Sequence, residues 1–222
     1  MILAIHQPMY LPYPGIFNKM KSVDTFVFLN DVQYSDGYYY NRNRIKTQRG
    51  ALMLTVPLLK SLGQKLNEIR IATDIKWQKK HLKSIYANYS NAEYFSSYID
   101  FFEEIYNMHW EKLHNLNMKT MLHIMRTLDI NTQFYFSSEL KCESTGTQRI
   151  INICNALDAD VYLSGTSGKD YVDQKLFKES NIKLEFQRYA PKEYKQLWGD
   201  FIPNLSIIDL LFNIGGKAKE FI

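Results

Sequence analysis

The sequence predicts an α/β protein in which helices flank a parallel-dominated sheet, with a helical subdomain in the middle of the chain. Short apolar runs such as Ile2–Ile5 are typical of buried strands, and they alternate with helical segments at both ends of the chain. Residues 74–128 instead carry apolar side chains at helical spacing over a long stretch. We expect residues 1–222 to form a single domain, with the helical insertion at 74–128.

The opening segment predicts a strand–helix–strand unit. A strand over 2–5 is followed by a loop in which Pro12 and Pro14 are expected to prevent regular structure. A short helix over 16–21 then leads to a second strand over 25–29. Such a unit implies two parallel strands with a right-handed crossover.

The rest of the chain continues this alternation. Thr73 or Asp74 can cap the first helix of the middle section, whose apolar stripe includes Ile75. A capping-box pattern begins at Ser206, and Gly215 ends the apolar run behind it. The other expected strands cover 42–47, 52–58, 66–72, 133–136, 161–163 and 183–186. The other expected helices cover 97–107, 109–128, 147–157 and 172–180. Loops are expected over 35–41 and 164–171.

Composition narrows the function classes. The net charge of +4 is too small for a general nucleic-acid binder, so no nucleic-acid partner is expected. It suits a phosphorylated small molecule or proximity to an anionic membrane surface. Two cysteines, Cys142 and Cys154, form neither a disulfide framework nor a zinc site, and no metal is expected. No signal peptide or transmembrane segment is found, so we expect a cytoplasmic protein.

The first candidate site follows the first strand. Ligands of open α/β sheets bind outside the carboxyl ends of strands, and His6 stands at that position. A histidine there can act as a general base or acid, or it can simply cap the strand. Asp31 follows the second strand, so the two side chains would share one crevice if the strands are neighbours. They could then work as an acid/base pair, or as a metal ligand and a base. We also assign substrate contacts in this region to Gln7, Tyr10, Gly15 and Gln33.

The second candidate is a cationic ribbon. If residues 42–46 are extended, Arg42, Arg44 and Lys46 lie on one face, where they could hold a pyrophosphate. Asn41, just before the ribbon, is a further candidate contact. The alternative is a solvated edge strand whose charges prevent aggregation.

The third candidate is the loop of small residues over 164–171. It lies between a strand and a helix, where exposed backbone N–H groups favour an anion. The alternative is an ordinary loop with Asp170 as the helix cap. The candidate contacts are Ser164, Gly165, Ser167, Gly168 and Tyr171.

Other residues have structural explanations. His81 lies one helical turn from Trp77 and could edge a pocket, but it is interpreted as a surface histidine. Cys154 lies on an apolar helix face and is expected in the core. No catalytic triad order, HExxH, GxGxxG or Walker A motif is present.

The ordered motifs resemble the WbqC-like family over essentially the whole chain. The motifs are His6-Gln7-Pro8 with Tyr10-Leu11-Pro12 and Gly15, Asp31-Val32-Gln33, Asn41 to Lys46 with Thr55-Val56-Pro57, Tyr162 to Gly165 with Gly168 and Tyr171, and Phe201 to Asn213. The resemblance implies a role in O-antigen or other polysaccharide assembly, as a glycine or aminoacyl transferase acting on a sugar amine. The opening alone is similar to adenylyl-transferring nucleotidyltransferases and pantothenate synthetase. However, the paired-histidine HxGH signature is missing at 12–15.

Three hypotheses follow. The first is an enzyme that transfers an acyl or aminoacyl group from a donor to the amine of a nucleotide-linked sugar, with His6 and Asp31 as acid/base groups. The second is an ATP-dependent ligase that forms an adenylate. The third is a non-catalytic carbohydrate-binding assembly protein.

Overall fold

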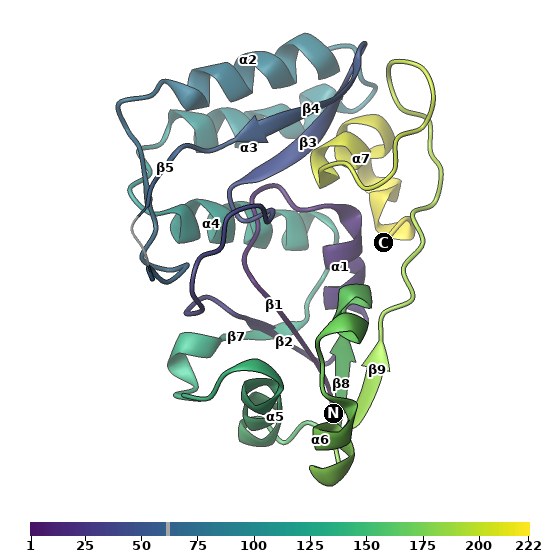
Figure 1. The fold of residues 1–222 in the computed structure, drawn as a ribbon. Helices are drawn as coiled ribbons and strands as arrows, with labels where there is room; N and C mark the ends of the chain where they lie inside the picture. The colour runs from purple at the N-terminus through teal and green to yellow at the C-terminus, as the bar shows by residue number, and fades with distance from the viewer. Residues whose placement is uncertain (61–62) are drawn as a thin grey trace.

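A parallel sheet forms the centre of the computed structural model, which describes residues 1–60 and 63–222 (Figure 1). Within these residues the sheet has five strands in the order β7-β2-β1-β8-β9, and all neighbouring pairs are parallel. Counted along the chain, this order is 3-2-1-4-5, the doubly wound arrangement. The predicted α/β class is confirmed. The strands are β1 (Ile2–His6), β2 (Thr25–Phe28), β7 (Gln133–Phe136), β8 (Val161–Ser164) and β9 (Lys183–Phe186).

Helices cover both faces of the sheet. One core cluster contains residues of β1 and β2 together with α1, the middle helices α2–α4 and α7, and a second cluster packs α5 and α6 on the other face. Figure 1 shows α2, α3 and α7 at one end of the molecule and α5 and α6 at the other. The helices are α1 (Pro14–Lys21), α2 (Trp77–Tyr89), α3 (Phe95–Asn107), α4 (Leu113–Thr127), α5 (Gly146–Ala156), α6 (Gln174–Glu179) and α7 (Ile207–Ile214).

The two central strands are apolar on both faces because both faces are covered. Side chains alternate along a strand, so Ala4 and Phe26 enter the first cluster, whereas Ile5 and Val27 enter the second. This explains why the strand segments are continuous apolar runs, as buried parallel strands are.

A hairpin holds the loop that follows β1. Its strands are β3 (Arg42–Thr47) and β4 (Gly50–Thr55), which pair antiparallel. Buried Asn43 donates its side-chain N–H to the carbonyls of Tyr10, at 3.4 Å, and Leu11, at 2.6 Å. The Leu11 backbone has φ +43°, a left-handed conformation that is uncommon for leucine. These bonds hold the loop in one conformation. A further short pair is β5 (Leu58–Leu59) with β6 (Arg70–Ile71).

Several local expectations are corrected. Pro14 does not exclude helix but begins α1, because the first helical position needs no backbone N–H. Neither Thr73 nor Asp74 caps α2, which begins only at Trp77. Ile75 lies before that helix and is 42% exposed, instead of lying on its buried stripe.

Other corrections concern the later elements. The strand expected over 66–72 is limited to Arg70–Ile71. Asp173, and not Asp170, caps α6 by accepting from two backbone N–H groups. Ser206 caps α7 by accepting from the backbone N–H of Ile208, and α7 ends at Gly215 as expected. The reciprocal bond of a capping box is not formed, because the Ser206 N–H donates to the carbonyl of Arg44 and the Asp209 carboxylate accepts from Tyr89 and Tyr194. No helix in residues 1–60 and 63–222 has the length and apolar character that a bilayer crossing requires.

Candidate functional site

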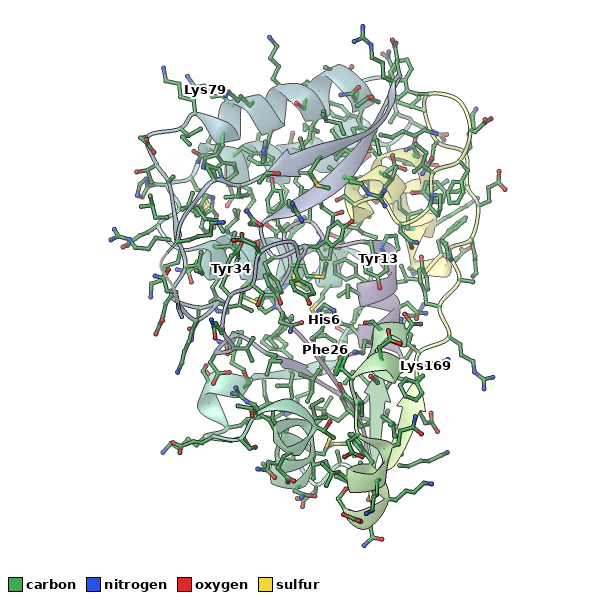
Figure 2. The ribbon with its side chains drawn as sticks, viewed as in Figure 1. His6, Tyr13, Phe26, Tyr34, Lys79 and Lys169 are labelled. Atoms are coloured by element: carbon green, nitrogen blue, oxygen red, sulfur yellow. The ribbon has the colours of Figure 1, made fainter. Side chains whose placement is uncertain are left out.

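A cavity of about 800 Å³ lies at the carboxyl ends of the central strands. Its lining comes from the ends of β1 and β2, the loop after β8 and the start of α5. Strands β1 and β8 are neighbours whose connections run to opposite faces, and ligands of doubly wound sheets bind at this switch point. The cavity is therefore the candidate site. Figure 2 shows His6 near the centre of the molecule, in this region.

His6 lines the cavity in its neutral form. Its Nδ1 lies 3.0 Å from the carbonyl oxygen of Gln7. Because a carbonyl can only accept, Nδ1 carries the proton and Nε2 is left as a proton acceptor. Burial, together with the charge of Lys19, lowers the pKa of His6 to about 4. The imidazole is thus neutral at physiological pH.

Lys19 is a buried cation beside this histidine, and it is not among the residues predicted from the sequence. The side chain comes from α1, lines the cavity and is only 2% exposed. Its Nζ donates to the carbonyl of Ile5 at 2.9 Å. Burial lowers the pKa of Lys19 to about 7. The signal that could have found it is its i+3 spacing from Ile16, which places a lysine on the apolar face of a short helix.

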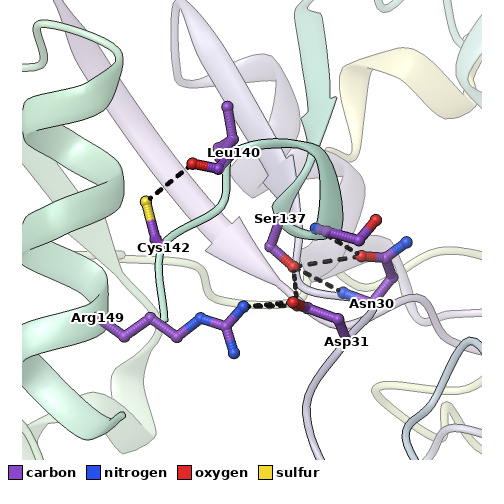
Figure 3. A network of polar contacts seen from close by, with 7 residues as sticks. Asn30, Asp31, Ser137, Leu140, Cys142 and Arg149 are labelled. Atoms are coloured by element: carbon purple, nitrogen blue, oxygen red, sulfur yellow. Dashed lines mark hydrogen bonds and ion pairs between the residues drawn. The ribbon is translucent and has the colours of Figure 1, made fainter. Parts of the chain in front are cut away.

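Asp31 also lines the cavity, but its carboxylate belongs to a polar network (Figure 3). Arg149 reaches it from α5 with one nitrogen 2.7 and 2.6 Å from the two carboxylate oxygens, and Ser137 donates its hydroxyl. Burial opposes ionisation, yet these bonds hold the pKa of Asp31 below its ordinary value. His6 and Asp31 both line this cavity, as expected, but among the described residues they share no hydrogen bond.

Tyrosines form a large part of the wall and the mouth. Tyr13 and Tyr40 lie deeper, whereas Tyr38 is 60% and Tyr171 is 66% exposed. Such rings offer flat apolar surfaces with a polar tip, which suits sugars and bases. Six tyrosines line the cavity among the described residues: Tyr13, Tyr38, Tyr39, Tyr40, Tyr162 and Tyr171.

The loop after β8 contributes backbone and small side chains to the lining. Gly165, Ser167 and Tyr171 line the cavity, whereas Ser164 and Gly168 lie behind it in close contact. A Cβ at Gly168 would lie 1.9 Å from Ser164 Oγ, so only glycine fits there without rearrangement.

Gln7 and Gln33 line the cavity as well, but three other candidates do not. Tyr10 is buried and bonds to His81 Nδ1 at 2.8 Å, which ties the β1 loop to α2. His81 is accordingly 5% exposed and is no surface histidine.

The other two candidates support the structure around the site. Gly15 packs where a Cβ would lie 2.3 Å from the ring of Tyr13, and its carbonyl accepts from Gln187 at 2.8 Å. Asn41 donates to the carbonyl of Val56 at 2.8 Å, within the hairpin region.

The cationic ribbon lies outside the cavity lining. Arg42 donates to the carbonyl of Gly37 at 2.6 Å, and so braces the loop that carries the mouth tyrosines. Lys46 is 1% exposed and donates to Gln196 and to backbone carbonyls. Arg44 is half-buried, and its backbone carbonyl accepts from Ser206 at 2.8 Å. We therefore do not assign these three cations to the cavity.

Other residues complete the lining. Gln187, just after β9, and Arg149, from α5, line the cavity, and no motif or spacing in the sequence singles them out. Over residues 1–60 and 63–222, no group of three or more His, Cys, Asp or Glu side chains is arranged to hold a metal ion. Cys154 is buried in the core, as expected.

Comparison with known proteins identifies the family. The model of the WbqC-like protein family matches residues 7–221. The chain is 36% identical to an uncharacterized protein of Mycobacterium tuberculosis, Rv1507c, over 99% of this chain and 96% of that protein. It is also 31% identical to human SCY1-like protein 2, over 49% of this chain and 12% of that protein. No solved structure matches significantly. On the family match and the full-length similarity, the chain belongs to the WbqC-like protein family.

Proposed function

We propose that the protein transfers an acyl or aminoacyl group to the amine of a nucleotide-linked sugar in polysaccharide assembly. The observation that carries this proposal is a neutral imidazole and a buried lysine side by side in one cavity at the switch point of the sheet. Such a cavity suits the phosphates of a nucleotide, and its tyrosines suit the sugar and the base.

The imidazole supplies the proton transfer that amide formation requires. The amine nitrogen attacks the acyl carbon, and Nε2 of His6 accepts the proton that the nitrogen loses. The proton then passes to the leaving group of the donor as the bond between the acyl carbon and that leaving group breaks. In this mechanism Asp31 does not touch the imidazole but fixes Arg149 against the cavity wall.

A transfer assay tests the catalytic role of His6. Nucleotide-linked amino sugars are incubated with glycyl or acyl donors, and the amide product is measured by mass spectrometry. His6→Gln should lower the rate by about 10²- to 10⁴-fold, because a general base contributes that much, while sugar-nucleotide binding is retained. His109→Gln, at an exposed position outside the cavity, is the matched control. An unchanged rate in His6→Gln would remove the mechanism.

Pyrophosphate exchange separates this reaction from adenylate formation. Exchange of labelled pyrophosphate into ATP in the presence of glycine requires an acyl adenylate. Transfer from a preformed donor without exchange supports our proposal, whereas ATP- and amino-acid-dependent exchange would favour the ligase.

A further inference from the structure

We infer that Lys19 binds a phosphate group of the ligand, through charge-assisted hydrogen bonds from its ammonium. The inference rests on the proposed function in one respect, since it takes the cavity to hold a nucleotide-linked substrate. It assigns the phosphate contact to a residue of α1, in place of the cationic ribbon of β3.

The first support is the geometry of the buried ammonium. Lys19 is 2% exposed, and its Nζ has one hydrogen bond among the described residues, to the carbonyl of Ile5. An ammonium has three N–H donors, so two remain for another partner. Lys19 also lines the cavity, so these donors are within reach of a ligand there.

The second support is the missing counter-charge. Within the described part of the chain, no carboxylate forms an ion pair with Lys19, whereas the other cation of the wall, Arg149, is paired with Asp31. A buried lysine side chain is rarely left without a partner, because removing its charge from water is costly. An anion in the cavity would supply that partner. Burial also lowers the pKa of Lys19, as expected for a cation that has no anionic partner.

The third support is the open space beside the ammonium. Gly165 lies at the end of β8, and a Cβ there would be 3.9 Å from Nζ of Lys19. Its φ of −67° would permit other residues, so backbone strain does not require glycine. The absent side chain leaves room between β1 and β8, where phosphates bind in doubly wound sheets.

Phosphate is favoured over carboxylate by the surroundings. The lining carries tyrosines with flat rings, a wall that suits a phosphate attached to a base or a sugar. A phosphate group could come from a nucleotide or from free phosphate, and the experiment below distinguishes these two ligands.

Binding is measured by calorimetry with pyrophosphate, UDP and acetate as probes, at pH 7. We expect the wild type to bind pyrophosphate and UDP, and Lys19→Met to bind both about 10- to 100-fold more weakly, since hydrogen bonds to charged groups are worth that factor. Lys21→Met is the matched control, because this neighbour on α1 is exposed and donates to the carbonyl of Lys219. Gly165→Val, which keeps the lysine but fills the adjacent space, should weaken binding as well.

The outcomes separate the two proposals. UDP binding that is equal in the wild type and Lys19→Met would refute the inference and leave the proposed function standing. Acetate binding that depends on Lys19, without pyrophosphate binding, would overturn the assignment to phosphate. Pyrophosphate binding that depends on Lys19, in a protein that neither binds nor modifies any nucleotide-linked amino sugar, would refute the proposed function and support the inference.

Discussion

Lys19→Met should make the protein more stable, and the gain should shrink as the pH rises. Burial lowers the pKa of Lys19 from 10.5 in the ordinary state to about 7 in the folded protein. Between pH 7 and pH 10.5 the unfolded chain binds more protons than the folded protein does, so the free energy of unfolding rises with pH. Integration gives a cost of about 4 kcal/mol at pH 7 and about 1 kcal/mol at pH 9.5. Methionine removes this cost and loses the bond to Ile5, worth about 1 kcal/mol.

Urea unfolding of the wild type and Lys19→Met at pH 7 and pH 9.5 measures the effect. We expect a gain of about 3 kcal/mol at pH 7 and almost none at pH 9.5. This window lies above the titration of His6, whose pKa is lowered from 6.5 to about 4, so the imidazole contributes little. A difference between the two proteins that stays constant across the window would show that Lys19 is not a buried cation, and the reasoning on its counter-charge would fail.

Three further predictions test other parts of the site. Asp31→Asn should lower the free energy of unfolding by about 1–3 kcal/mol near neutral pH, because it leaves Arg149 without its carboxylate, and thermal unfolding would show this. Tyr171→Ala should leave stability within about 0.5 kcal/mol, since the ring is exposed, but should weaken UDP binding about 10-fold in calorimetry if the ring stacks on the base. Gly168→Ala should destabilise the protein by about 1–3 kcal/mol in urea unfolding, because the added carbon meets Ser164 Oγ; unchanged stability would contradict the close packing.

The order of strands and helices could be predicted from the sequence because each element carries a local pattern. Segments such as Ile2–His6 and Thr25–Phe28 are apolar runs, and α4 shows a helical period. The positions of His6 and Asp31 at one cavity also followed, since His6 ends β1, Asp31 follows β2, and the two strands are neighbours. Here the local pattern and the topology agree.

The orientation of side chains toward the cavity could not be predicted in the same way. Alternation along β3 groups Arg42, Arg44 and Lys46, but it does not say which part of the molecule that group meets. Lys46 is directed to carbonyls of the segment before α7, more than 150 positions away in the chain. Likewise, Lys19 shares a helix face with Ile16, but that spacing does not say whether the face is covered or which part of the molecule the lysine meets.

Lys19 and His6 are electrostatically coupled, and this coupling makes the strength of the base depend on the ligand. Burial and the charge of Lys19 both lower the pKa of His6. An anion bound at Lys19 offsets that charge, so it should raise the pKa of His6 from about 4 toward its ordinary value. The imidazole would then become a stronger base only when the substrate is in place.

Nuclear magnetic resonance titration of the His6 ring, with and without saturating pyrophosphate, measures this shift. We expect a higher His6 pKa with the ligand. In Lys19→Met the pKa should already be raised without the ligand, because the charge that lowers it is absent. Exposed His109 serves as the internal reference in the same spectra. A His6 pKa that falls or stays fixed when pyrophosphate binds would place the anion away from Lys19, because a negative charge beside an imidazolium can only stabilise it.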